Sequence, residues 1–392
     1  MPGEVTTVNQ IIIKDPITLG DIEQAINKIC LNKGVPLQLP SSCISKRRGA
    51  MYDAARLQML VTWARHAGDA YLNFHEANNI NSVLEELCDY SPGIAAVRLT
   101  KGVKVGDTEV TMREALMPAA KKMQATDNEI FNEITKGRSI DMICVSGSSI
   151  QYLRPLFYAR SQEKVKSCVE MWHVIEKMFQ SITYKKDRLF FPDDLVVRLS
   201  TFMHELFQNT QEHATSDFKR QPYPAHVEGI FMSWIQIDEK IYSSDFKGHE
   251  RLSKFLARDL LTSGDEVART TLRCLQISFF DSGPGFASRA TGLSAQEMTL
   301  IEERQALMKC LQKNETSKNQ TGAGNGLPSV IEALRKIGGM IRIRSGRHAI
   351  FNTFPPNDTT IDLFDFQDWS PEKLACAEGS VVSILIPLRR AG

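Results

Sequence analysis

Residues 204–214 read HELFQNTQEHA, and the spacing of their polar side chains raises the question of a functional site. Glu205, Asn209 and His213 are spaced by four, so at about 3.6 residues per helical turn they share one face. A solvated face would accept any polar residue at these positions. A carboxylate, a carboxamide and an imidazole in register therefore indicate a site on this helix.

The segment around these residues predicts a long helix that packs on a core. Residues 191–214 begin with a phenylalanine, Pro192 and two acids, which suit a helix N-terminus. Residues 226–238 follow as an alternating strand. The helix carries a broad apolar stripe made of Leu195, Val196, Leu199, Phe202, Met203, Leu206 and Phe207.

A second segment, TLRCLQISFFDSGPGFAS at 271–288, predicts a buried strand that runs directly into Asp281. An aspartate at the end of a buried strand can present its carboxylate to a cleft. Gly283 and Gly285 follow at alternate positions, and glycines allow a ligand to approach the backbone closely. We expect a binding loop here.

A third segment, TGAGNGLPSVIEALRK at 321–336, opens an amphipathic helix with three glycines at alternate positions, Gly322, Gly324 and Gly326. Backbone N–H groups ahead of a helix N-terminus form an anion site. Residues 338–354 then predict a hairpin, and EGSVVSILIPLRR at 378–390 predicts a last buried strand that includes Ser380.

Taken in order, these segments resemble the GHKL nucleotide-binding fold of DNA gyrase, a heat-shock chaperone, histidine kinases and MutL-type repair proteins. The resemblance covers 190–392 and implies an α/β sandwich with a mixed sheet that binds ATP and Mg²⁺. It implies that Asn209 ligates Mg²⁺ and that Asp281 binds the adenine amino group. The two glycine boxes and the terminal Gly-Thr segment correspond to Gly283, Gly285, Gly322, Gly324, Gly326 and Ser380, with serine in place of threonine.

The resemblance leaves the chemistry open. In the gyrase and repair branch, a glutamate four residues before the asparagine is the general base for hydrolysis, which implies that role for Glu205. The alternative for Glu205 is a solvent-facing or capping acid. The Asn-x-x-x-His-Ala ending resembles the histidine-kinase branch, so His213 lies near the phosphates or closes the helix C-terminus.

Two departures from the family pattern concern regions beside the expected site. We expect an insertion at 239–270 either to cover the nucleotide or to bind a partner. The lid at 286–321 ends in a polar stretch in which Lys318 is the cation nearest to the glycines. Lys318 is therefore a candidate for a γ-phosphate contact, with a solvated lid lysine as the alternative.

The N-terminal half shows no nucleotide fingerprint. Residues 1–110 predict a small α/β domain with regulatory or partner-binding function, faintly similar to STAS domains. Within this domain we expect residues 93–100 to form a strand. Residues 111–184 predict a mainly helical connector, and 185–392 the nucleotide-binding domain. We expect a protein partner or a homodimer to form through the N-terminal region.

Composition excludes several classes of protein. The 392 residues are 42% hydrophobic and 24% charged with a net charge of +1, which indicates no global footprint for nucleic acid. No apolar run of about 18 residues exists, and the first residues do not resemble a secretory signal. The eight cysteines form no C-x-x-C pair. We expect a cytoplasmic protein with reduced thiols and no membrane partner.

Three function classes follow. The first is an ATPase or ATP-gated switch in signalling, stress response or defence. The second is a protein kinase of the histidine or serine type, although His173 upstream lacks the acid that usually follows a phospho-acceptor. The third is a nucleotide-binding scaffold without turnover, against which Glu205 argues.

Overall fold

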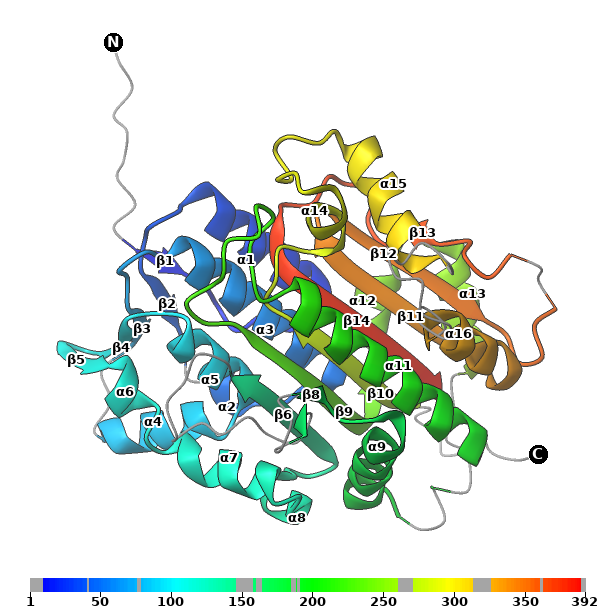
Figure 1. Cartoon of the computed structure of the whole chain (residues 1–392), viewed down its shortest axis with the longest axis horizontal. Coiled ribbons are helices and arrows are strands. Elements are labelled where there is room, and N and C mark those ends of the chain that lie inside the picture. The colour runs from blue at the N-terminus through cyan, green and yellow to red at the C-terminus, as the bar shows by residue number, and fades with distance from the viewer. Residues whose placement is uncertain are drawn as a thin grey trace.

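The chain folds as an α/β protein built around two β-sheets (Figure 1). The structure is a computed structural model, and it describes residues 10–40, 42–75, 79–145, 158–159, 164–184, 188, 191–259, 271–312, 326–359 and 362–388. Among these residues no helix is both long enough and apolar enough to cross a membrane.

The N-terminal sheet is mixed. Its five strands lie in chain order, with the first four parallel and the last antiparallel. The strands are β1 (Ile11–Ile12), β2 (Leu37–Leu39), β3 (Leu72–Phe74), β4 (Gly102–Val105) and β5 (Thr108–Thr111). The helices among them are α1 (Leu19–Leu31), α2 (Ser42–Ser45), α3 (Ala50–His66), α4 (Ile80–Cys88) and α5 (Ser91–Arg98).

The strand predicted at 93–100 is wrong, because this segment forms α5. Pro92 lies in the first turn, where its fixed φ suits a helix. Ile94 and the next three residues are all buried, so the apolar run is covered on every side. A short run of this kind has no periodicity that separates a buried helix from a buried strand.

The second sheet has seven strands, and each neighbouring pair is antiparallel. The expectation of a mixed sheet in the C-terminal region is therefore wrong. β10 and β11 point the same way, but the last strand, β14, inserts between them and pairs with both. In sheet order the strands are β13 (Gln367–Asp368), β12 (His348–Phe354), β11 (Gly339–Gly346), β14 (Ala377–Pro387), β10 (Thr271–Asp281), β9 (Val227–Asp238) and β6 (Ser139–Val145).

Helices cover both faces of the seven-stranded sheet (Figure 1). One face carries α9 (Cys168–Ile182), α11 (Asp193–His213) and α16 (Gly326–Ile337), and the other carries α3, α12 (Glu239–Phe246) and α13 (Glu250–Asp259). β10 shows how the sequence produces this arrangement. Its Leu275, Ile277 and Phe279 face α11, whereas Leu272 and Phe280 face α3.

Helix α3 joins the two sheets, because its N-terminus is anchored in the seven-stranded sheet. The N–H groups of Ala50 and Met51 donate to Ser233 Oγ at 2.8 Å and Gln276 Oε1 at 3.2 Å. These side chains satisfy donors that have no partner within the helix. Gly49 has φ of +104°, and an added Cβ would lie 2.6 Å from Ile235 Cδ1, so a glycine is required at this close approach.

The segment between the sheets contributes to the seven-stranded sheet through β6, which pairs with β9. Asp141 of β6 is buried and accepts hydrogen bonds from Arg47 Nε at 3.0 Å, Ser91 N at 2.8 Å and Lys122 Nζ at 2.9 Å. Its two cationic partners hold the pKa of this carboxyl well below its usual range, against the effect of burial. The other elements of the segment are α6 (Met112–Ala115), α7 (Ala119–Asp127), α8 (Phe131–Ile134), β7 (Tyr158–Ala159) and β8 (Lys164–Val165).

The described part of the insertion, α12 and α13, packs on the α3 face of the sheet, opposite α11. Asp245 of α12 is buried and accepts hydrogen bonds from Leu19 N at 2.8 Å and from Tyr52 Oη at 2.7 Å. It thereby holds the start of α1 and the first turn of α3. The described residues of the insertion bind the N-terminal unit to the sheet, and a role in covering a nucleotide or binding a partner stays a prediction.

Candidate functional site

Helix α11 carries the three polar residues that the sequence singles out. Its apolar stripe is buried against the sheet, and Asp193 and Asp194 lie in its first turn. Glu205 is partly buried, whereas Asn209 and His213 are exposed. The helix therefore places a carboxylate and a carboxamide one turn apart at the edge of its buried stripe.

Glu205 contacts the start of α16. Gly326 N donates a hydrogen bond to Glu205 Oε2 at 2.8 Å, and a Cβ added to Gly326 would lie 2.7 Å from that oxygen. The carboxylate thus sits at a helix N-terminus, where unpaired N–H groups and the helix dipole favour an anion. A glycine at position 326 makes this approach sterically feasible.

Asp281 ends β10 as predicted, and its side chain is buried with 1% of the residue exposed. Its Oδ1 accepts a hydrogen bond from Gly283 N at 2.9 Å. Burial raises the pKa of Asp281, and the positive charge of Arg289 opposes that rise. Arg289 Nη2 lies 3.8 Å from Asp281 Oδ2, which is an ion pair rather than a hydrogen bond.

The loop after Asp281 packs against the end of α11. A Cβ added to Gly283 would lie 2.5 Å from Ala214 Cβ, so only glycine allows this contact. Gly379 N donates to Gly283 O at 2.8 Å and ties the loop to the start of β14. The start of α16 and the loop after Asp281, which are far apart in the sequence, therefore contact the two ends of the segment 205–214.

Gly285 and Ser380 support the same loop from the sheet side. Gly285 has φ of +87° and precedes α14 (Phe286–Thr291). Phe286 N donates to Ser345 Oγ at 2.9 Å, and Ser345 Oγ lies 3.3 Å from Ser380 Oγ. Ser380 is fully buried and is the register partner of Asp281. Its hydroxyl is thus part of a buried polar pair beneath the loop.

The remaining predicted residues lie away from these contacts or outside the described residues. His213 is in the last turn of α11, with 45% of its side chain exposed and its Nε2 3.7 Å from Glu212 Oε2. Its position fits a residue that closes the helix C-terminus. Lys318, Gly322 and Gly324 lie outside the part of the chain that the structure describes.

Arg289 is a further candidate site residue, and no pattern in the sequence indicates it. It lies on α14, and its Nη1 donates to the carbonyl oxygen of Asn209 at 3.3 Å while Nη2 faces Asp281. It therefore joins α11 to the end of β10. An arginine in a predicted lid resembles any surface cation, so no pattern in the sequence marked it.

The protein oxygens at this site suit a Mg²⁺ ion that is held mainly by water and phosphate oxygens. Within the described ranges, no group of three or more His, Cys, Asp or Glu side chains could hold a metal ion. The exposed carboxamide of Asn209 offers one neutral oxygen. Mg²⁺ commonly takes one or two protein oxygens and completes its shell with water and phosphate oxygens. Asn209 fits such an arrangement.

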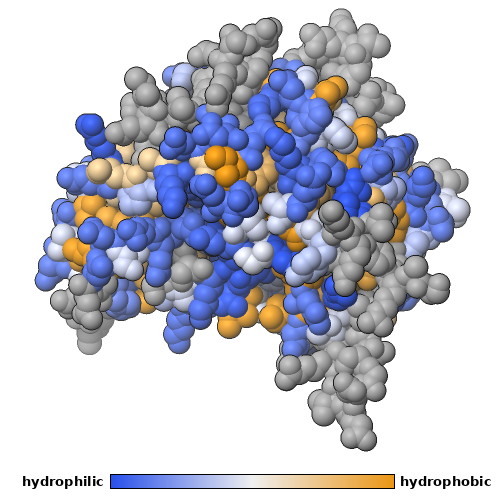
Figure 2. Space-filling view, turned by 90° about the horizontal axis from the view of Figure 1, so that it is seen from below, coloured by the Kyte–Doolittle hydropathy of each residue, from blue (hydrophilic) through white to orange (hydrophobic). Residues whose placement is uncertain are grey.

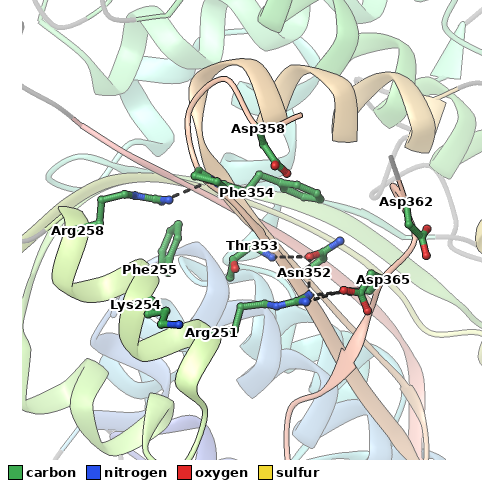
Figure 3. Close-up of a pocket in the computed structure, with 11 residues that line it drawn as sticks. Arg251, Lys254, Phe255, Arg258, Asn352, Thr353, Phe354, Asp358, Asp362 and Asp365 are labelled. Atoms are coloured by element: carbon green, nitrogen blue, oxygen red, sulfur yellow. Dashed lines mark hydrogen bonds and ion pairs between the residues drawn. The ribbon is translucent and has the colours of Figure 1, made fainter. Parts of the chain in front are cut away.

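Two cavities lie outside this constellation. One of about 380 Å³ lies between α13 and the segment after β12, with Arg251, Lys254 and Arg258 opposite Asp362 and Asp365 (Figure 3). The other, of about 280 Å³, lies behind the Asp281 loop and is lined by residues such as His66, Tyr223, Pro284 and Glu378. Glu205, Asn209 and Asp281 line neither of them.

No family model matches the chain, and neither does a curated protein or a solved structure. The class of the site therefore rests on its geometry. That geometry is a helix with a carboxylate and a carboxamide, a buried aspartate at a strand end, and a glycine-led helix N-terminus.

Proposed function

We propose that this chain is a Mg²⁺-dependent ATP-binding protein of the GHKL class and that it hydrolyses ATP. The observation that carries the proposal is the double contact of α11. Through Glu205 the helix reaches the glycine-led start of α16, and through Ala214 it reaches Gly283 beside the buried Asp281. These are the segments expected to bind the phosphates and the base.

Asp281 is suited to recognise the base. Its carboxylate is fixed by the Gly283 N–H and by the buried end of β10. A buried carboxylate accepts a hydrogen bond from an exocyclic amino group, and the loss of such a bond leaves a buried polar group unpaired. Asp281 would thus bind the adenine amino group while Gly283 allows the ring to approach.

Asn209 and the start of α16 are suited to the phosphates. The N–H of Gly326 points at an anion, which in this structure is the carboxylate of Glu205. A phosphate group could take this N–H, and Asn209 one turn along α11 would hold the metal. Mg²⁺ bound there would neutralise part of the charge on the phosphate oxygens.

Glu205 is suited to orient the attacking water. Its carboxylate lies at the helix N-terminus that would hold the terminal phosphate. A water hydrogen-bonded to this carboxylate would give up its proton to Glu205 as its oxygen attacks phosphorus and the bond to ADP breaks. The same carboxylate is the feature that favours hydrolysis over binding alone.

Asn209→Ala tests the metal role. We expect it to weaken binding of Mg·ATP more than binding of metal-free ATP, as measured by calorimetry with and without chelator. Gln208→Ala, one residue earlier on the same helix, is the matched control and should leave both affinities unchanged. An equal loss for both ligands would show that Asn209 supports the helix and does not hold the metal.

Incubation with γ-labelled ATP separates hydrolysis from phosphoryl transfer. His204, a histidine followed by an acid, has its Nδ1 within 2.7 Å of the Lys166 carbonyl oxygen and lies within the site helix. His173 is exposed on α9. We expect the label as free phosphate. Label retained on the protein would contradict hydrolysis and would identify a kinase.

A further inference from the structure

Arg289 is held in the candidate base site from three sides. Its Nη1 donates to Asn209 O at 3.3 Å, its Nη2 lies 3.8 Å from Asp281 Oδ2, and its guanidinium carbon lies 5.0 Å from the Phe286 ring centroid. Only 10% of the side chain is exposed. An arginine fixed in this way has lost most of its rotamer freedom before any ligand arrives.

One donor of this guanidinium is unused. Nη2 is buried and has no hydrogen-bond partner among the described residues, since Asp281 lies beyond hydrogen-bond distance. A buried N–H without an acceptor is costly, and in native proteins it usually marks a missing ligand, ion or water. The unused donor lies beside the carboxylate that we assign to the base.

We propose that Arg289 reads the adenine ring together with Asp281: Nη2 donates to N1 of adenine while Asp281 accepts from the neighbouring amino group. This inference rests on the proposed function. A donor and an acceptor side by side match the edge of adenine, on which an amino donor and a ring-nitrogen acceptor are neighbours. Arg289 is then a specificity residue for the base.

The hydrogen bond that Asp281 already accepts favours adenine over guanine. Guanine presents two neighbouring donors, N1–H and its amino group, which pair best with both oxygens of one carboxylate. Here Oδ1 already accepts the Gly283 N–H at 2.9 Å, and Oδ2 is the oxygen that faces Arg289. One available oxygen beside one cationic donor fits the single amino group and single acceptor of adenine.

The test compares ATP with 1-deaza-ATP, in which a C–H replaces N1. A hydrogen bond from a charged donor corresponds to about 10–100-fold in affinity, so the wild-type protein should bind 1-deaza-ATP that much more weakly than ATP. Arg289→Met keeps an unbranched apolar stem over Phe286 but has no donor. This variant should bind the two nucleotides with nearly equal affinity.

A control variant and the wild-type protein separate failure of this inference from failure of the proposed function. Arg304→Met changes an arginine of α15 (Leu300–Leu311) that pairs with Asp368, and it should retain the wild-type ratio. The ratio of the affinities for ATP and 1-deaza-ATP is measured on the wild-type protein, so misfolding of Arg289→Met would not remove the test. ATP binding without discrimination against 1-deaza-ATP, or tighter binding of GTP, would overturn this inference alone. Absence of ATP binding by the wild type would overturn the proposed function as well.

Discussion

At the scale of single residues, Glu205 and Asp281 differ in how they are held. Glu205 is partly buried and accepts the N–H of Gly326 at a helix start, a position that also suits a phosphate. Asp281 is buried at a strand end and is fixed by its own loop. A fixed carboxylate suits recognition of a base, and a displaceable one suits chemistry at a phosphate.

Asp281→Asn should weaken ATP binding by about 1–3 kcal/mol, because an amide can turn a donor toward the amino group of adenine. Isothermal calorimetry of the folded variant measures the loss. Asp69→Asn, the same change at an exposed position, is the control and should have no effect. ATP affinity equal to that of the wild type in folded Asp281→Asn would remove Asp281 from the site.

Lowering the pH should also weaken ATP binding. Burial raises the pKa of Asp281, so this carboxyl is protonated at a higher pH than an ordinary aspartate. The protonated form accepts the amino group less well, and ATP affinity should fall.

At the scale of elements, the sequence predicted several of the helices and strands that carry the candidate site. The long helix, the strand into Asp281 and the C-terminal hairpin have strong periodicity or marked turn residues, and they occur as α11, β10 and β11–β12. The order of strands in the sheet could not be predicted, because the insertion of β14 between β10 and β11 depends on contacts far apart in the chain.

The contacts of Arg289 could not be predicted for a related reason. They depend on where α14 lies relative to α11, and no local pattern fixes that placement. The position of Gly326 could be predicted, because a glycine ahead of an amphipathic helix indicates the helix start. Its contact with the Glu205 carboxylate could not be predicted from the sequence.

Gly326→Ala tests the junction of α11 and α16. An added Cβ would lie 2.7 Å from Glu205 Oε2 and 3.0 Å from Phe202 Cα, so the helix start must shift. We expect a loss of about 1–3 kcal/mol in the free energy of unfolding, measured in urea. ATP binding should also weaken, as the Gly326 N–H moves away from its ligand.

Gly20→Ala is the matched control for this prediction. Gly20 lies in the first turn of α1, and an added Cβ would make only one contact, at 3.7 Å from Thr18 Oγ1. Its stability should therefore equal or exceed that of the wild type. If Gly326→Ala behaved like Gly20→Ala in both assays, the close approach of Glu205 to α16 would be wrong.

At the scale of the whole molecule, the two sheets share one core. Leu37 and Leu72 of the N-terminal sheet belong to the same buried cluster as Phe280 and Leu385 of the seven-stranded sheet. The face shown in Figure 2 is mostly hydrophilic, with separate small hydrophobic spots. Because the core is shared, the N-terminal unit and the seven-stranded sheet should unfold together.

Glu23→Gln tests this coupling. Glu23 of α1 pairs with Arg344 of β11 through Nε at 2.9 Å and Nη2 at 3.0 Å, and with Arg342 at 3.5 Å. Both arginines are 1% exposed, so loss of their anion should cost about 3–5 kcal/mol of unfolding free energy. Glu85→Gln, at an exposed position, should change the stability by less than about 0.5 kcal/mol.

Hydrogen exchange on the same proteins shows whether the coupling is global. In the wild type, β2–β3 and β10–β14 should exchange with the same opening free energy, and Glu23→Gln should lower both by the same amount. A variant in which only the N-terminal sheet loses protection would show that the two sheets unfold independently.

If α11 brings Glu205 to a bound ATP for hydrolysis, removing the charge of Glu205 should abolish turnover and spare binding. Bound nucleotide and released phosphate are measured on single preparations of the wild type and of Glu205→Gln, whose amide oxygen can still accept the Gly326 N–H. We predict equal ATP binding and a turnover that is lower by about 10²–10⁴-fold in the variant. Wild-type turnover in Glu205→Gln, or no ATP binding by either protein, would contradict the account.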